Sequence, residues 1–266
     1  MVWFFLSLCW LSQPEIDAVN LSYRFNEGET NVYLEDVEMT IKGDFLIDAS
    51  RTSTMKYRRQ ERCTGKNGEN FTVENIFTNV EKSADFMEEA VPINRFSDTP
   101  IQMMVAPNGN INNLQVDAAQ TFKAQEMTYI QNFCKRLYTL LPAKRVRPGE
   151  SWKDQIVITL DSPILRNMDQ IIDLTYTFRG MEKLNGANLA KIEITGTMRG
   201  TVDQGQFGSF TGNIRGAMYV NPSLGKEIRS DVDYEIQANL IFPEGDFFYS
   251  TTMKLSRVLN LTEQIR

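Results

Sequence analysis

The 266-residue chain contains no histidine. Imidazole is the side chain whose ordinary pKa lies closest to neutrality, so its absence excludes Ser-His-Asp and Cys-His nucleophilic catalysis, imidazole acid–base chemistry and histidine-ligated zinc or haem. Basic residues are fewer than acidic ones: the chain has 28 Lys and Arg and 34 Asp and Glu, which gives a formal net charge of −6. Binding a nucleic-acid backbone needs clustered cations, so we expect no nucleic-acid partner.

The sequence also lacks an apolar run long enough to predict a transmembrane helix. The run Val2–Leu11 is almost wholly apolar, but as a helix it would span roughly 15 Å of a hydrocarbon core roughly 30 Å thick. Its length is typical of a secretory signal core, although no basic residue precedes it. We therefore interpret residues 1–13 as a signal-peptide remnant and expect export to the periplasm or cell surface. A lipidated Cys9 and a buried N-terminal strand or helix stay open as alternatives.

Cysteine is scarce, with three in the chain. Loss of residues 1–13 would leave Cys63 and Cys134, which in an exported protein could form a disulfide or remain two buried free thiols. The spacing does not decide between these, because a disulfide depends on Cα atoms that approach within about 7 Å in the fold. Neither cysteine has a histidine or a neighbouring cysteine to activate it, so we expect no redox role and no metal.

Apolar and polar residues alternate from about residue 20 to 114 and again from about 156 to 262. Such runs, rich in β-branched and aromatic residues, predict antiparallel strands. Asn67-Gly68 and Asn108-Gly109 predict tight hairpins. Glycines cluster from Gly196 to Gly216 without a GxGxxG motif, so they indicate hairpin turns or bends in curved strands rather than a phosphate-binding loop.

The segment Asp117–Leu141 has a different pattern, with apolar residues at steps of three to five. This spacing predicts a helix of about 24 residues with one apolar face, capped by Asp117 and ended by Pro142. Lys and Gln on its other face exclude a membrane span. We expect the helix to cover the sheet, or to form a movable lid over a cavity.

Together these patterns predict a mainly β (α+β) protein, with two curved antiparallel sheets or open half-barrels and one long covering helix. The predicted units are residues 14–142, a β meander plus the helix, and residues 154–266, a C-terminal antiparallel β unit. Residues 143–153, which contain Pro148 and Gly149, are predicted to link them.

Several short motifs resemble those of a family of exported bacterial proteins known as a domain of unknown function. They are Tyr23-x-Phe25-x-x-Gly28-Glu29, Ala106-Pro107-Asn108-Gly109, Leu141-Pro142, Val146-x-Pro148-Gly149-Glu150-Ser151-Trp152 and Ile194-x-Gly196-x-x-x-Gly200. The resemblance implies a signal peptide or lipid anchor, and no known activity, cofactor or catalytic residue. In architecture, a curved sheet with a covering helix is more distantly similar to the periplasmic lipoprotein-carrier fold.

Methionine and phenylalanine are abundant, at 12 and 16 residues. Methionine tolerates variable contacts, so these residues form either a plain core or an apolar groove between sheet and helix. Our hypothesis is a non-enzymatic exported binding protein for a lipid, lipoprotein or other apolar ligand, with Phe122, Met127 and Ile130 as the ligand-binding residues. A structural or protein-interaction module of the bacterial cell envelope is the alternative.

Paired carboxylates could still support an enzyme without histidine. Asp231, Asp233 and Glu235 share one face of a predicted strand, since residues two apart point the same way. A solvated outer face explains them equally well, and they lack the loop of a calcium site. We therefore expect no catalytic residue, no cofactor and no metal.

Overall fold

The structure is a computed structural model that describes residues 18–43, 50–83, 96–116, 122–142, 144–160, 168–202, 208–241 and 248–265. The predicted signal-peptide remnant and Cys9 lie outside these residues. Within them, no helix has both the length and the apolar character needed to cross a membrane.

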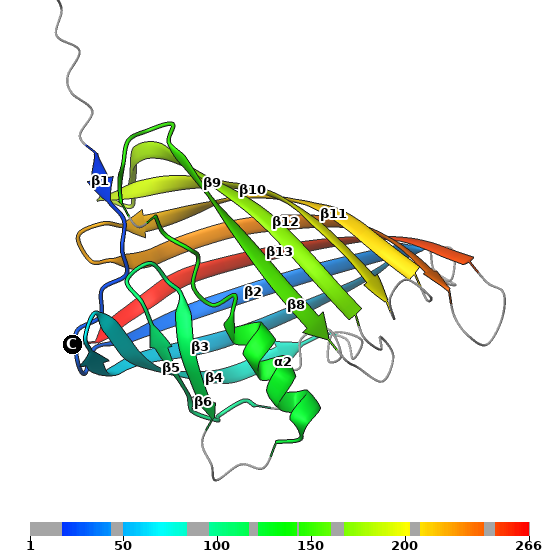
Figure 1. Cartoon of the computed structure of the whole chain (residues 1–266), viewed down its shortest axis with the longest axis horizontal. Coiled ribbons are helices and arrows are strands. Elements are labelled where there is room, and N and C mark those ends of the chain that lie inside the picture. Colours follow the sequence, from blue (N-terminus) through cyan, green and yellow to red (C-terminus); the bar gives the residue numbers. More distant parts are fainter. Residues whose placement is uncertain are drawn as a thin grey trace, which may run out of the picture.

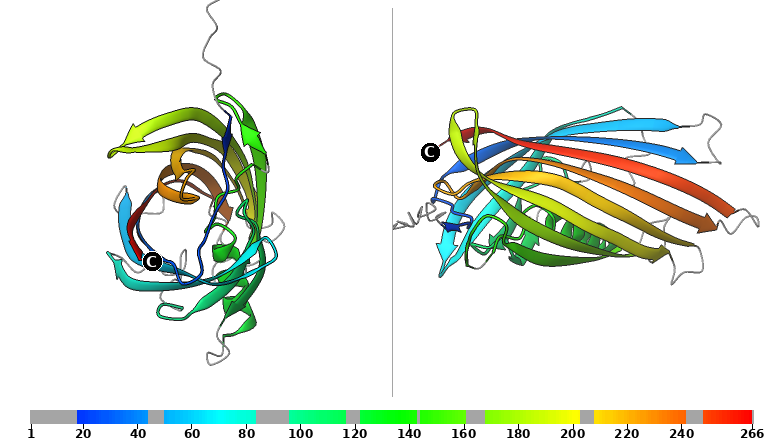
Figure 2. Two further views of the ribbon diagram at one scale, coloured as in Figure 1. Left: turned by 90° about the vertical axis from the view of Figure 1, so that its left-hand side faces the viewer. Right: turned by 90° about the horizontal axis from the view of Figure 1, so that it is seen from above.

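One large antiparallel sheet dominates the molecule and curves into a deep trough (Figures 1 and 2). Its eleven strands lie in the order β6-β5-β4-β3-β2-β13-β12-β11-β10-β9-β8. Their bounds are β2 Thr30–Gly43, β3 Arg51–Asn67, β4 Asn70–Lys82, β5 Ile101–Val105, β6 Ile111–Val116, β8 Ser151–Leu160, β9 Met168–Leu184, β10 Ala187–Val202, β11 Gly208–Asn221, β12 Lys226–Ile241 and β13 Phe248–Ile265. A small ribbon pairs β1 (Val19–Asn20) with β7 (Arg145–Val146).

The prediction of two curved sheets is wrong. β13 pairs with β2 along its length, from Thr251↔Gly43 to Ile265↔Thr30, so strands from both predicted units join one sheet. Alternation along a strand reports which faces are apolar, but it carries no information about which distant strand will be the partner. Both predicted hairpins are confirmed, because β3–β4 and β5–β6 are joined through Gly68 and Gly109, each at positive φ.

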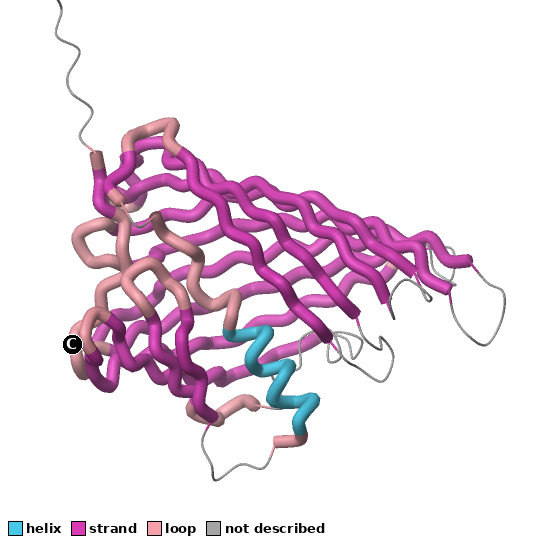
Figure 3. Tube along the Cα trace, viewed as in Figure 1, coloured by secondary structure: helices cyan, strands magenta, loops and turns pink. Residues whose placement is uncertain are grey.

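The prediction of a long covering helix, and with it an α+β fold, is also wrong. The described helix, α2, runs only from Ala124 to Cys134 (Figure 3), and the predicted cap Asp117 lies outside the described residues. Leu137 and Leu141 are buried as the apolar spacing indicates, but they belong to an irregular segment. That segment bonds to other elements, since the Leu141 N–H donates to the Asn108 carbonyl at 2.8 Å.

Missing side chains allow the strong curvature of the sheet at β10 and β11. On their inner faces each glycine lies opposite a large residue, in the pairs Gly196↔Ile214, Gly216↔Ile194, Gly212↔Met198 and Gly200↔Phe210. A Cβ on Gly216 would lie 2.3 Å from the carbonyl oxygen of Asp231, so the neighbouring strand occupies the space of a side chain. The glycines were predicted to form either hairpin turns or bends in curved strands, and these four lie at bends within strands.

The interior is packed mainly with aromatic and aliphatic side chains. Phe77 of β4 meets Phe96 and Phe133 edge to face, with ring centroids 5.6 and 5.3 Å apart. Phe133 belongs to α2, which lies along the open side of the trough beside β8 (Figure 1). The helix and the segment that follows it therefore cover the inner face of the sheet.

Candidate functional site

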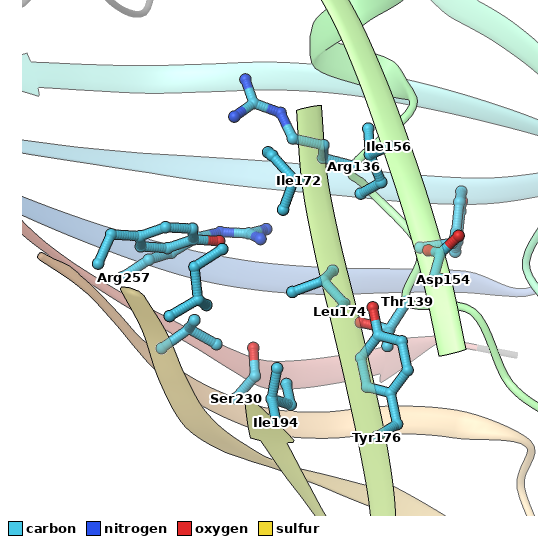
Figure 4. A pocket seen from close by; sticks show the side chains of 14 residues that line it. Arg136, Thr139, Asp154, Ile156, Ile172, Leu174, Tyr176, Ile194, Ser230 and Arg257 are labelled. Atoms are coloured by element: carbon cyan, nitrogen blue, oxygen red, sulfur yellow. The ribbon is translucent and has the colours of Figure 1, made fainter. Parts of the chain in front are cut away.

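A small, mainly apolar pocket lies on the inner face of the trough, where residues 136–139 pass over β8 to β12 (Figure 4). Its cavity volume is about 60 Å³. The aliphatic part of its wall consists of Ile156, Ile172, Leu174, Ile194, Ile214 and Val232. The other eight lining residues carry polar groups, and they are Arg136, Tyr138, Thr139, Asp154, Tyr176, Ser230, Tyr234 and Arg257. The pocket therefore combines an aliphatic surface with hydroxyl and charged groups.

The predicted ligand-binding residues lie elsewhere in the core. Ile130 is buried, while Phe122 and Met127 are half-buried and pack against the same hydrophobic cluster. None of the three lines the pocket, and a ligand-binding role for them stays a prediction. Strand alternation alone could have marked Ile194 and Ile214 as inward-facing, but joining them in one pocket requires the β10–β11 register.

The polar end of the pocket is an ion pair beneath the apolar wall. Arg257 of β13 donates to Glu35 of β2 through Nε at 3.0 Å and through Nη2 at 2.7 and 3.0 Å. The Tyr57 hydroxyl donates to the same carboxylate at 2.5 and 2.6 Å. Burial by itself raises the pKa of Glu35, but the charge and hydrogen bonds of Arg257 outweigh it and hold that pKa below its ordinary value.

A second buried network fixes the covering segment to the sheet. The Tyr138 hydroxyl donates to Glu61 at 2.7 Å, and Asn31 donates to the other oxygen of Glu61 at 3.0 Å. Arg59 adds its charge, with Nη1 3.6 Å from Glu61. The helix α2 is also held to β8, because Asn132 donates to the Thr159 carbonyl at 2.8 Å. Tyr138 thus holds the covering segment to the sheet.

Glu227 is a third buried acid beside the pocket, bonded to the pocket residue Ser230. Burial raises its pKa above the ordinary value, because the charged form loses its solvation. A raised carboxyl pKa means that the folded state takes up a proton more readily than the unfolded state. Stability contributed by Glu227 is therefore fully present below its unfolded pKa and is lost as the pH rises through its folded pKa.

We expect Glu227→Gln to be more stable than the parent at neutral pH, by about 1 kcal/mol. Glutamine keeps the hydrogen bond to Ser230 without the buried charge. The advantage should shrink as the pH falls, because the parent then protonates Glu227 itself. Thermal melts at several pH values measure this, and a Glu235→Gln change on the exposed outer face is the control. If the stability difference between Glu227→Gln and the parent did not change with pH, the raised pKa of Glu227 would be contradicted.

The cysteines and carboxylates that the sequence singled out do not form a site among the described residues. Cys63 and Cys134 are free, buried thiols, and burial raises the pKa of Cys134 to about 12. Asp233 and Glu235 point outward into solvent, over an outer hollow of about 430 Å³ that they share with Arg215 and Lys254. In the part of the chain that the structure covers, no three Cys, Asp or Glu side chains gather in a way that could hold a metal.

No family model matches the chain, and no curated protein matches it. Among solved structures, it is similar to one of lipovitellin describing lipid–protein interactions, at 10% identity and a TM-score of 0.47, over 91% of this chain and 26% of that one. The chain thus spans about a quarter of that protein. A Bacteroides fragilis protein with a YmcC-like fold is similar at 9% identity and a TM-score of 0.29, over 91% and 99%. The hypothetical lipoprotein YmcC of Escherichia coli is similar at 10% identity and a TM-score of 0.25, over 82% and 85%.

Proposed function

We propose that the protein is a non-enzymatic exported binding protein that holds a single-chain lipid against the inner face of the trough. The observation that carries this proposal is the apolar pocket of about 60 Å³ beneath residues 136–139. Six aliphatic side chains supply a surface that gains free energy when hydrocarbon replaces water.

The cavity must enlarge to take a whole acyl chain. A volume of about 60 Å³ corresponds to roughly two water molecules. Enlargement requires α2 to move away from β8, which breaks the Asn132 hydrogen bond and withdraws Ile130 and Phe133 from the core.

The direct test is binding of laurate to the delipidated full chain, measured by titration calorimetry. We expect Ile194→Phe, which fills the pocket, to weaken laurate binding at least tenfold, because the added ring occupies the hydrocarbon site. The matched control is Val157→Phe, where an exposed outer position of β8 receives the same ring. Thermal melts of both variants report whether the fold is intact.

Equal affinity of the two variants for laurate would contradict the pocket as the binding site. Absence of saturable laurate binding by the parent protein, together with no lipid extracted from protein purified gently from its own host, would contradict lipid carriage altogether.

A further inference from the structure

One nitrogen of Arg257 is not used by its ion pair. The three hydrogen bonds to Glu35 involve Nε and Nη2, and none involves Nη1. Arg257 lines the pocket and is 24% exposed at its side chain, whereas Glu35 is fully buried. Figure 4 shows the Arg257 side chain at one side of the pocket, with Leu174 and Tyr176 toward the opposite side. Nη1 thus offers two N–H donors at the edge of an apolar cavity.

The guanidinium is also held rigidly. Glu35 is bonded by both Arg257 and Tyr57, so its two oxygens are occupied and the plane of the guanidinium is fixed. A fixed donor loses little conformational entropy when it binds a ligand. The guanidinium of Arg257 is therefore positioned in advance to donate a hydrogen bond to an acceptor on a ligand.

The unused nitrogen of Arg257 favours a negative acceptor through the strength of its hydrogen bonds, since the pocket wall has no excess of positive charge. Among the charged residues that line the pocket, Arg257 is paired with Glu35, and Arg136 is balanced in number by Asp154. Hydrogen bonds from guanidinium to an oxyanion are roughly twice as strong as those between neutral groups. A neutral acceptor would gain much less from the same nitrogen.

We propose that Nη1 of Arg257 binds the anionic head group of the ligand, a carboxylate or a phosphate, so that the pocket selects single-chain anionic lipids over neutral ones of equal length. This inference rests on the proposed function and adds the polarity of the ligand and its orientation, with the head group at Arg257 and the hydrocarbon along Ile172, Ile194 and Ile214.

Titrations of the full chain with laurate, dodecyl phosphate and dodecanol test the proposal, since these ligands differ only in the head group. We expect at least one of the two anions to bind at least tenfold more tightly than dodecanol, and the tighter anion identifies the head-group class. In the double variant Glu35→Gln/Arg257→Gln both charges are removed together, so no charge is left stranded. That variant should bind all three ligands equally, at the dodecanol affinity of the parent.

The control is Arg229→Gln/Asp231→Asn, which neutralises an exposed ion pair of 2.8 Å on the outer face and should keep the preference for the anion. A second variant, Arg257→Lys, retains a charge for Glu35 but lacks the planar fork, and should also lose the preference. Equal binding of dodecanol and both anions by the parent overturns the head-group inference while leaving lipid carriage intact. Failure of all three ligands to bind the parent overturns both.

Discussion

Arg257→Ala is expected to lower the free energy of unfolding by about 3–5 kcal/mol, the range found when one partner of a buried ion pair is removed. The alanine leaves Glu35 fully buried, with Tyr57 as a remaining donor to its carboxylate. A buried carboxylate without a matching cation is more costly than either the intact pair or a neutral replacement. Urea unfolding followed by circular dichroism measures the loss.

The pH dependence of the stability of Arg257→Ala shows whether the unpaired charge of Glu35 causes the loss. In the parent the pKa of Glu35 is held below its ordinary value, so its contribution is present above the unfolded pKa and is lost as the pH falls through the folded pKa. Without Arg257, burial raises that pKa instead, and the penalty diminishes on acidification as Glu35 takes up a proton. The difference in free energy of unfolding between the parent and Arg257→Ala should therefore become smaller as the pH falls.

Arg229→Ala is the matched control, because its partner Asp231 is partly exposed on the outer face of the sheet. Exposed pairs contribute about 0–1 kcal/mol, so this change should be nearly neutral. If the two alanine variants lost similar stability, the inner ion pair would have no special role in the fold.

The faces of the strands were predictable from the sequence, but the trough was not. Alternation correctly predicts that Val37 and Met39 point inward, since side chains in a strand change face at every residue. The single sheet depends on pairing between β2 and β13, which lie near opposite ends of the chain. The predicted helix was too long because Leu137 and Leu141 have helical spacing, although the Leu141 N–H bonds to Asn108 in the β5–β6 turn instead of continuing a helix.

The polar site was harder to predict than the fold. Glu35 and Arg257 occupy inward positions of their strands, where an apolar residue is the usual expectation. In one sequence such residues are indistinguishable from polar residues on a solvated face, as Asp233 and Glu235 prove to be. The β2–β13 register pairs Arg257 with Val37 and Leu259 with Glu35, so Glu35 and Arg257 are diagonal neighbours on one face, and only this pairing reveals the polar end of the pocket.

Gly216→Ala is the second change with a large expected effect, a loss of about 3 kcal/mol or more. The added Cβ would lie 2.3 Å from the Asp231 carbonyl oxygen and 2.9 Å from the Val232 Cα. Both are backbone atoms, so no side-chain rotation relieves the contact and β11 must move away from β12. Because Val232 also lines the pocket, laurate binding should weaken together with stability, as measured by melts and calorimetry.

Gly65→Ala in β3 separates this contact from the general effect of replacing glycine in a strand. A Cβ there meets no atom within 4 Å, and alanine restricts the unfolded chain more than glycine does, so the change should be neutral or slightly stabilising. A large loss at Gly216 beside none at Gly65 would attribute the curvature of the sheet to the close approach of β11 and β12. Equal effects at both positions would mean that curvature does not depend on the missing side chain, and the trough would then owe its shape to the segment packed within it.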